Sequence, residues 1–554
     1  MLTILICIKR ASRPFVPMRL RRLQDVFLLL LAALLVLPLL AVLASWLQPT
    51  GQSVQILGEM AATVLPGYVW TTLWLCLWVG AGVALVGTAS AAAVTLFDFP
   101  GRRTFEWALL LPLAMPAYVV AYAYTDYLQF SGPLQSAIRS SLGVEGRVLP
   151  EIRSLSGAVF VFTFSLYPYV YLLARTALGE SAGHLMEAAR LLGAPLRRRI
   201  LQVALPMARP AVAAGIALAL METLADFGVS SYFGIQTFTT GIYKAWLAMD
   251  NRIAAAQLAT LLLALVTLLL ALEYRAQRRL RFTSSRGERS GSTEAQPARL
   301  RGRQVVWAWV ICLVPVLLGF VLPVLFMLRP LAAEWSGLPW DRFLQWSYNS
   351  IRLGAISAVL AVAIALLLAF SLRRAPSALT RGVVQLASLG YAVPGAVIVV
   401  GLLLPVGWLQ QVAPGSSAGF WITSTVIGVV WAYLVRFCAV ALQSVQSGYA
   451  RIPVSFDDTA RMLGTGGFAM LTRVHWPLLK RSTAAAALLV FVDVMKELPA
   501  TLVLRPFNTD TLAVVAYQFA RDERLGEAAL PSLALVLAGL IPVILLSRTL
   551  RSKR

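Results

Sequence analysis

Long apolar segments alternate with short polar ones along the whole chain. Each apolar segment is about as long as the roughly 20 helical residues that cross a bilayer core of about 30 Å. The first set lies near 27–47, 67–95, 105–125, 155–174, 211–232 and 253–273. The second set lies near 305–328, 350–371, 383–405, 419–442, 483–504 and 528–547. This pattern predicts an all-α polytopic membrane protein with about 12 transmembrane helices.

The composition agrees with a membrane protein. The 554 residues are 59% hydrophobic and 13% charged, with a mean hydropathy of +0.75, whereas soluble domains average about 25% charged residues. The four cysteines lack the spacing of metal ligands and are expected to be small core residues. Residues 1–18 do not resemble a cleavable signal, and Met1 and Met18 are both treated as candidate starts.

The net charge of +23 would indicate nucleic acid in a soluble protein, but here it indicates orientation. Most of the 48 Lys and Arg fall in segments that share one side of the predicted topology. Because positive charge marks the cytoplasmic side of short loops, we expect both termini to be cytoplasmic. No nucleic-acid partner is expected.

The chain divides into two similar halves. A basic linker at 275–304 separates residues 1–274 from residues 305–554, with six predicted spans in each half. Because six is even, both halves enter the membrane in the same direction, as parallel repeats. Residues 187–206 and 458–477 align without a gap, and each forms a polar segment between the fourth and fifth spans of its half. A duplicated and fused gene explains both features.

The two repeated segments predict helix, glycine break and helix. Glu187 suits the positive N-terminal end of a short helix, and Gly193 supplies a left-handed stop. Ala188 and Ala189 leave that helix with a smooth face that can lie against another protein. The residues that we assign to docking are Glu187, Ala188, Ala189, Gly193 and Pro206 near 180–210, and Asp458, Ala460, Gly464 and Pro477 near 450–481.

Residues 187–206 resemble the cytoplasmic loop by which ABC-importer permeases dock onto their ATPase. Residues 224–246 and 493–524 resemble the corresponding stretches of ferric-iron importer permeases, a fused twelve-span family. The second loop departs from the pattern, with Asp458-Thr459 in place of Glu-Ala and Trp476 in place of Leu.

The resemblance implies the fold of a type I ABC importer permease in the bacterial inner membrane. It also implies two copies of an ABC ATPase subunit and an extracytoplasmic iron-binding protein as partners. The chain itself has no P-loop, since none of its lysines follows a glycine. We therefore expect a transport subunit that is not an enzyme and binds no cofactor, with ATP used by the partner ATPase.

Four carboxylates of the fifth spans form the candidate translocation pathway. Glu222 and Asp226 are four residues apart, as are their repeat counterparts Asp493 and Glu497, so each pair is expected on one helix face. Glu222 lies about 18 Å along a helix that starts near Pro210, close to mid-bilayer. A charge at that depth requires water or a partner. An acidic lining suits transient passage of iron, while release argues against a stable metal site.

Several alternatives remain open. The four carboxylates could instead be structural, paired with Lys496 or Arg436. His184 and His475 are expected at the surface, and tyrosines such as Tyr118 and Tyr167 are expected to be interface anchors. The cargo could be thiamine, phosphonate or another small solute. A twelve-span secondary transporter would be driven by an ion gradient, and the paired docking loops argue against it.

Overall fold

The computed structural model describes most of the chain. The described residues are 18–47, 51–180, 183–284, 297–374, 376–415 and 417–551. Within these helices, the side chains of some residues lie outside the description: 18–25, 180, 183–185, 187, 273–274, 276–284, 418 and 546–551.

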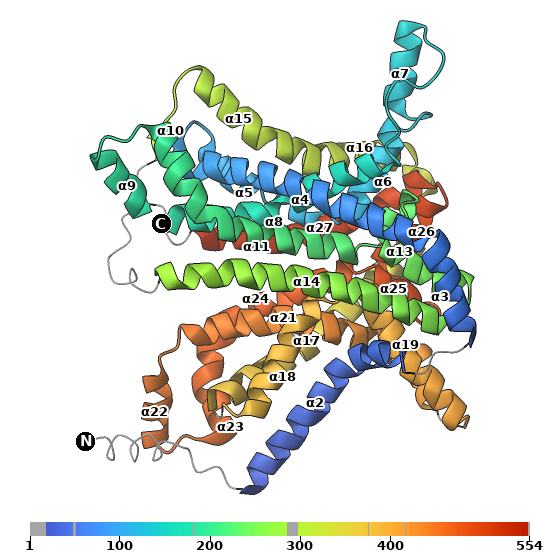
Figure 1. Cartoon of the computed structure of the whole chain (residues 1–554), viewed down its shortest axis with the longest axis vertical. Helices are drawn as coiled ribbons and strands as arrows, with labels where there is room; N and C mark the ends of the chain where they lie inside the picture. Colours follow the sequence, from blue (N-terminus) through green and yellow to red (C-terminus); the bar gives the residue numbers. More distant parts are fainter. Residues whose placement is uncertain are drawn as a thin grey trace.

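The first half is built from helices that run in both directions across the long bundle shown in Figure 1. Its α-helices are α2 (Met18–Ala44), α3 (Gly51–Thr63), α4 (Leu65–Leu96), α5 (Arg102–Ala108), α6 (Ala117–Leu128), α7 (Pro133–Leu142), α8 (Leu155–Glu180), α9 (Gly183–Leu191), α10 (Leu196–Arg199), α11 (Leu205–Ala225), α12 (Gly228–Tyr232), α13 (Phe238–Tyr243) and α14 (Arg252–Ser284). Short 3₁₀ or π turns lie at η1 (Leu111–Ala114), η2 (Ile200–Ala204) and η3 (Lys244–Ala248).

The second half repeats this order. Its α-helices are α15 (Arg303–Val316), α16 (Leu322–Ala333), α17 (Trp340–Arg374), α18 (Ala378–Leu389), α19 (Gly395–Val412), α20 (Ala418–Thr423), α21 (Val426–Ala450), α22 (Val454–Met462), α23 (Gly467–Ala469), α24 (Trp476–Lys496), α25 (Pro499–Leu504), α26 (Leu512–Arg521) and α27 (Leu525–Arg551). Short turns lie at η4 (Leu317–Val321), η5 (Trp335–Gly337), η6 (Gly390–Ala392) and η7 (Met470–His475). Two-residue strands β1 (Phe97–Asp98) and β2 (Ala298–Arg299) pair in parallel.

The predicted all-α membrane architecture is confirmed. Among the described residues, ten helices are long and apolar enough to cross a membrane, and one bent pair raises that number to eleven. The remaining predicted span corresponds to α24, which also carries Lys480, Arg481, Asp493 and Lys496. Helix α14 continues to Ser284, well into the segment expected to be a linker.

Proline breaks the third predicted span of each half, so the continuous helices expected at 105–125 and 383–405 are wrong. Residues 102–114 and 117–142 meet at an angle of 89°. The backbones at the two breaks match, with φ −60° and ψ 142° at Pro116 and φ −59° and ψ 141° at Pro394. Proline disfavours helical backbone at the residue before it, and each proline therefore precedes the first residue of a new helix, α6 or α19.

The two halves exchange their first spans. Helix α2 packs against α18 and α19 of the second half, and α15 and α16 of the second half pack against α4 and α6 of the first (Figure 1). Single hydrogen bonds fix both exchanges: Trp431 Nε1 donates to the Leu34 carbonyl at 2.7 Å, and the Tyr124 hydroxyl to the Leu318 carbonyl at 2.7 Å. Each six-span half is therefore incomplete when packed alone.

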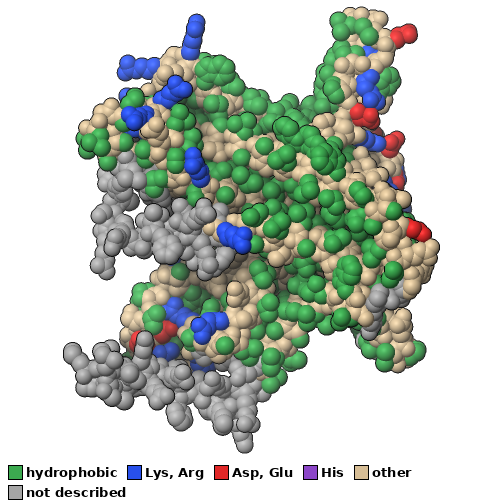
Figure 2. Space-filling model, in the orientation of Figure 1, with side chains coloured by type: hydrophobic (Ala, Val, Ile, Leu, Met, Phe, Trp, Pro, Cys, Tyr) green, Lys and Arg blue, Asp and Glu red, His purple; other side chains and the backbone are tan. Residues whose placement is uncertain are grey.

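The repeated loops lie at the same end of the bundle. Figure 1 shows α9 and α10 above α22 and α23 on the left, with α3 and α7 at the opposite end. On the face shown in Figure 2, Lys and Arg side chains gather at the end that carries the loops. The charge distribution thus has the one-sided character that the sequence indicated.

Candidate functional site

The first repeated loop (residues 183–204) and the second repeated loop (residues 454–475) end their short helices with the same backbone turn. Gly193 has φ +76° and Gly464 has φ +78°, where a side chain would be strained. The Ala194 amide donates to the Ala189 carbonyl and the Gly193 amide to the Arg190 carbonyl, at 3.0 Å each. Thr465 and Gly464 make the equivalent bonds to Ala460 and Arg461. This is the Schellman arrangement, and it confirms the predicted glycine stops.

Each loop presents a pair of apolar side chains to the exterior at this turn. Leu191 and Leu192 are 86% and 87% exposed, and their repeat counterparts Met462 and Leu463 are 89% and 79% exposed. Isolated exposed apolar residues are ordinary in proteins, whereas a matched pair at symmetry-related turns indicates a contact surface. These four residues were not singled out from the sequence, although they flank the predicted glycines.

The other predicted docking residues occupy different environments. Ala188 is exposed, Ala189 is partly buried, and Ala460 is a buried residue of α22. Asp458 is exposed and pairs with Arg461 at 3.0 Å. Pro206 and Pro477 lie in the first turns of α11 and α24, where a missing amide hydrogen is tolerated. The side chain of Glu187 lies outside the described residues.

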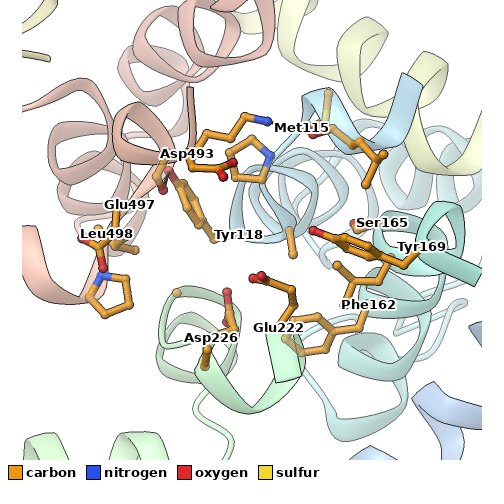
Figure 3. Close-up of a pocket in the computed structure, with 18 of the residues that line it drawn as sticks. Met115, Tyr118, Phe162, Ser165, Tyr169, Glu222, Asp226, Asp493, Glu497 and Leu498 are labelled. Atoms are coloured by element: carbon orange, nitrogen blue, oxygen red, sulfur yellow. Dashed lines mark hydrogen bonds between the residues drawn. The ribbon is translucent and has the colours of Figure 1, made fainter. Parts of the chain in front are cut away.

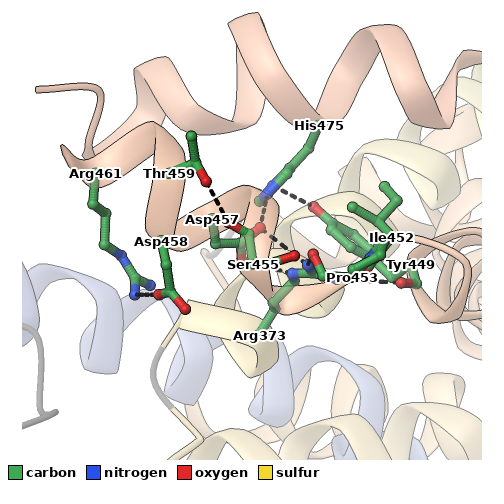
Figure 4. A network of polar contacts seen from close by, with 10 residues as sticks. All are labelled: Arg373, Tyr449, Ile452, Pro453, Ser455, Asp457, Asp458, Thr459, Arg461 and His475. Carbon is green, nitrogen blue, oxygen red and sulfur yellow. Dashed lines mark hydrogen bonds and ion pairs between the residues drawn. The ribbon is translucent and has the colours of Figure 1, made fainter. Parts of the chain in front are cut away.

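A buried polar network holds the second repeated loop against the membrane helices (Figure 4). Arg373, at the end of α17, donates through Nε and Nη2 to the two carboxylate oxygens of Asp457 on α22, at 2.7 and 3.0 Å. The Asp457 carboxylate also contacts His475, which is 1% exposed. Nδ1 of His475 lies 3.2 Å from the Tyr449 hydroxyl. The expected surface position of His475 is therefore wrong, and His184 lies outside the described side chains.

Asp457 is charged in this network. Burial opposes the charge, but hydrogen bonds from Arg373 and His475 together with the nearby positive charge outweigh burial and hold the pKa of the carboxyl below its usual value. In the first half, the counterparts of Asp457 and His475 are the buried apolar residues Met186 and Ala204. The polar attachment is thus a feature of the second repeated loop.

A cavity of about 170 Å³ lies in the centre of the bundle, between the two halves. Figure 3 shows Glu222 and Asp226 on one side of it and Asp493 and Glu497 on another. Pro116, at the break in the third span, also lines the cavity. Three tyrosines line it as well: Tyr118, Tyr169 and Tyr391. The structure therefore brings together all four carboxylates that the sequence placed in the pathway.

The four carboxylates divide into two kinds, contrary to the expected shared helix faces. Helix α11 ends at Ala225 and α24 ends at Lys496, so Asp226 and Glu497 leave the helix with extended backbones (φ −72°, ψ 130° and φ −69°, ψ 124°). Each then caps the short helix that follows. Asp226 accepts from the Val229 amide at 2.8 Å, and Glu497 accepts from the Ala500 and Thr501 amides at 2.9 and 3.0 Å.

Glu222 and Asp493 remain within their helices and line the cavity. Glu222, from the first half, accepts a 2.6 Å hydrogen bond from the Tyr391 hydroxyl of the second half. Its other carboxylate oxygen lies 3.9 Å from Nη2 of Arg436. Glu222 thus contacts the opposite half through both carboxylate oxygens.

Arg436, which the sequence offered as a structural partner, bridges the two sets of carboxylates. Its Nη1 lies 3.4 Å from Oε1 of Glu497, and its Nη2 faces Glu222. Lys496, the other candidate partner, donates to the Leu113 carbonyl at 2.8 Å. Within the described part of the chain, no group of three or more His, Cys, Asp and Glu side chains is arranged to hold a metal ion.

The tyrosines expected to anchor the membrane interface are instead core residues. Tyr118 and Tyr167 are buried, and Tyr118 donates to the Lys496 carbonyl at 3.3 Å across the two halves. Large aromatic side chains fill much of the space around the cavity because each buries a large area with few rotatable bonds.

The geometry agrees with comparisons to known proteins. Residues 84–282 match the family described as "Binding-protein-dependent transport system inner membrane component". The chain is 26% identical over 488 residues to the Fe(3+)-transport system permease protein FbpB 2 of Haemophilus influenzae, covering 86% of this chain and 88% of that protein. The chain is an ABC-type permease with two fused halves.

Two further relatives show the breadth of the similarity to this permease. It is 25% identical over 514 residues to a probable ABC transporter permease protein, y4fN, of Sinorhizobium fredii, covering 87% of each chain. It is 28% identical over 210 residues to a putative 2-aminoethylphosphonate transport system permease protein, PhnU, of Salmonella choleraesuis, covering 37% of this chain and 71% of that protein. The permease is thus a multi-pass inner-membrane protein of a binding-protein-dependent system.

Proposed function

We propose that the permease is the membrane subunit of an ATP-driven importer that moves ferric iron, delivered by a solute-binding protein, into the cytoplasm. The observation that carries this proposal is the similarity to an Fe(3+)-transport permease across both halves of the chain. The cavity lined by Glu222 and Asp493 supports it, because a hard trivalent cation prefers oxygen ligands.

Energy comes from a separate ATPase, which the two repeated loops bind. Their matched Schellman turns expose Leu191, Leu192, Met462 and Leu463 at one end of the bundle. Two equivalent loops fit two copies of one ATPase subunit, with one apolar pair buried against each copy. ATP is hydrolysed in that partner, and the permease supplies neither a catalytic residue nor a cofactor site.

The repeated loops face the cytoplasm, as do both termini. The gathering of Lys and Arg at that end supports this orientation, since positive loop residues are retained inside. The binding protein then docks at the opposite end, where α3 and α7 lie. The cargo passes from that end through the central cavity.

The experiment that tests this function is uptake of radioactive iron by cells that express the permease together with the ATPase and binding protein from its own gene neighbourhood. Uptake should require all three proteins and should continue when an uncoupler collapses the proton gradient but ATP is maintained. If uptake instead stopped when the proton gradient was collapsed and ATP was maintained, the result would support the secondary-transporter alternative.

A second cargo, 2-aminoethylphosphonate, is favoured by the similarity to PhnU over part of the chain. Competition distinguishes the two cargoes. Excess unlabelled ferric salt should abolish iron uptake, and excess 2-aminoethylphosphonate should leave it unchanged. Uptake of labelled 2-aminoethylphosphonate that excess ferric salt leaves unchanged, with no uptake of labelled iron, would assign the phosphonate instead.

A further inference from the structure

We propose that Arg436 is a selectivity residue: a tethered cation that occupies the carboxylates of the pathway, excludes monovalent cations from them, and is displaced only by a multivalent cation. This inference rests on the proposed cation pathway. It assigns to Arg436 a role in choosing what enters the cavity, beyond that of a counter-ion.

The position of Arg436 places it where a passing cation must compete with it. Arg436 lies near the middle of α21, and its side chain lines the cavity. The guanidinium contacts Glu497 of its own half and faces Glu222 of the other half, at 3.4 and 3.9 Å. It therefore sits between carboxylates from both halves.

The contacts of Arg436 are too few for a guanidinium that serves only to hold the structure. It is 8% exposed, and its Nε atom has no hydrogen-bond partner among the described residues. Its Nη1 and Nη2 atoms lie at the long distances of 3.4 and 3.9 Å from Glu497 and Glu222. Arg373, by comparison, makes hydrogen bonds through all three of its nitrogens at distances of 2.7 to 3.2 Å.

Glu497 does not depend on Arg436 for its hydrogen bonds. Its carboxylate already accepts from the Ala500 amide, the Thr501 amide and the Thr501 hydroxyl, at 2.9, 3.0 and 2.7 Å. The pair is also asymmetric in the repeat, because the counterpart of Arg436 in the first half is Ser165, whose hydroxyl has no hydrogen-bond partner in the described structure. The positive charge of Arg436 is thus present on one side of the repeat only, as is that of Lys496, whose counterpart is Ala225.

Electrostatics gives this arrangement its selectivity. An ion that displaces Arg436 from a carboxylate exchanges one Coulomb interaction for another. A monovalent ion carries the same charge as Arg436, so its Coulomb attraction to the carboxylate is no stronger. It must also compete with a guanidinium that the chain holds at high effective concentration beside the carboxylate. An ion of charge +3 gains in proportion to its extra charge. The same guanidinium therefore blocks Na⁺ and K⁺ while admitting a multivalent cargo.

Terbium luminescence can test this proposal on the purified full-length permease without iron or any partner. Tb³⁺ is a hard trivalent probe, and bound Tb³⁺ should be sensitised by Tyr169 and Tyr391, which line the cavity. Loss of the tyrosine-sensitised signal in Glu222→Gln would assign the signal to this site.

Arg436→Gln should raise the affinity for Tb³⁺ by about tenfold, since the ion no longer displaces a cation, and Na⁺ should now compete with Tb³⁺. Arg436→Lys should behave as the wild type. Lys496→Gln is the matched control, because it removes from the same lining a positive charge whose hydrogen bond goes to the Leu113 carbonyl, whereas that of Arg436 goes to Glu497. It should leave the site resistant to Na⁺.

A second variant perturbs the pair without changing any charge. A β-carbon at Gly395 would lie 3.0 Å from Oε1 of Glu497 and 3.4 Å from Nη1 of Arg436. Gly395→Ala should loosen the pair and shift Tb³⁺ affinity in the same direction as Arg436→Gln, and it carries the test if the charge variant fails to fold.

The proposal is overturned if folded Arg436→Gln binds Tb³⁺ no more tightly than the wild type, or if Lys496→Gln gains the same Na⁺ competition. Either result can occur while iron uptake is normal, which would leave the proposed function intact. Conversely, the expected Tb³⁺ results with no iron uptake in cells would show a selective cation site and a different cargo.

Discussion

Nε2 of His475 lies 3.1 Å from Oδ1 of Asp457, and both side chains are buried. Asp457 belongs to α22 of the second repeated loop, whereas His475 immediately precedes α24. Helix α24 carries Asp493 into the central cavity. This contact therefore joins the surface that we assign to ATPase docking with the helix that lines the pathway, through a short and rigid connection.

Asp457→Asn should loosen that connection. It removes the charge that pairs with Arg373, and breaking a buried pair in this way typically costs about 3 kcal/mol or more. We expect a lower thermal midpoint in detergent and ATP hydrolysis that is poorly coupled to uptake. The matched control for the thermal midpoint is Asp458→Asn, because its exposed pair with Arg461 contributes little to stability. Equal effects of the two substitutions on the thermal midpoint would contradict the role of the network.

The same substitution makes a prediction about pH. Because the folded pKa of Asp457 is depressed, its stabilisation is fully present above the unfolded value of about 4 and is lost as pH falls through the folded value. The difference in thermal midpoint between wild type and Asp457→Asn should therefore be constant near neutrality and shrink below about pH 4. A difference that grew on acidification would be inconsistent with a charged Asp457.

The Schellman glycines provide a test of the loop backbone. Gly464→Val should impair coupling, because a β-branched residue fits poorly at φ +78°. Gly466→Val is the control two residues away, since Gly466 has φ −137° and open space around it. Gly193→Val should reproduce the effect in the first repeated loop. ATPase co-purification and uptake measure the outcome, and harm from Gly466→Val alone would exclude the backbone explanation.

The exposed apolar pairs predict where the ATPase binds. Leu191→Ser with Leu192→Ser should reduce co-purification of the ATPase without lowering the thermal midpoint, because these side chains make little contact within the permease. Each buried leucine at such a contact is worth roughly 1–3 kcal/mol. Leu142→Ser is the control, since Leu142 is also exposed, at 65%, but lies on α7 at the opposite end. Unchanged co-purification would place the docking surface elsewhere.

Most of the predicted spans, the repeated segments and the loop turns were accessible from the sequence because they depend on local patterns. Apolar length predicts a span, and a glycine at matching places in two copies predicts a left-handed turn. The exchange of α2 and α15 between halves was not accessible, since lipid and a partner helix are equally apolar surroundings for a span. Hydropathy therefore does not predict which half a helix contacts.

The roles of the carboxylates show a similar limit. A four-residue spacing places Glu222 and Asp226 on one face only while the helix continues, and α11 ends at Ala225. The nearest helix-breaking residue, Gly228, lies beyond that end as the first residue of α12, so the sequence does not mark Ala225 itself. The prolines at 116 and 394 did give such a signal, which the long apolar segments around them obscured.

The cavity allows the last prediction, which separates the two kinds of carboxylate. Glu222→Gln with Asp493→Asn should slow iron uptake while the thermal midpoint stays close to that of the wild type, because both side chains line the cavity and neither caps a helix. Asp226→Ala with Glu497→Ala should instead lower the midpoint, since loss of a helix cap costs about 1 kcal/mol each and Arg436 loses its closest partner. Uptake per folded molecule distinguishes the pairs, provided that expression and monodispersity are measured in parallel. If the first pair imported iron at the wild-type rate, an acidic pathway through this cavity would be ruled out. If the second pair left the midpoint unchanged, the capping role would be wrong, and Asp226 and Glu497 would return to consideration as pathway residues.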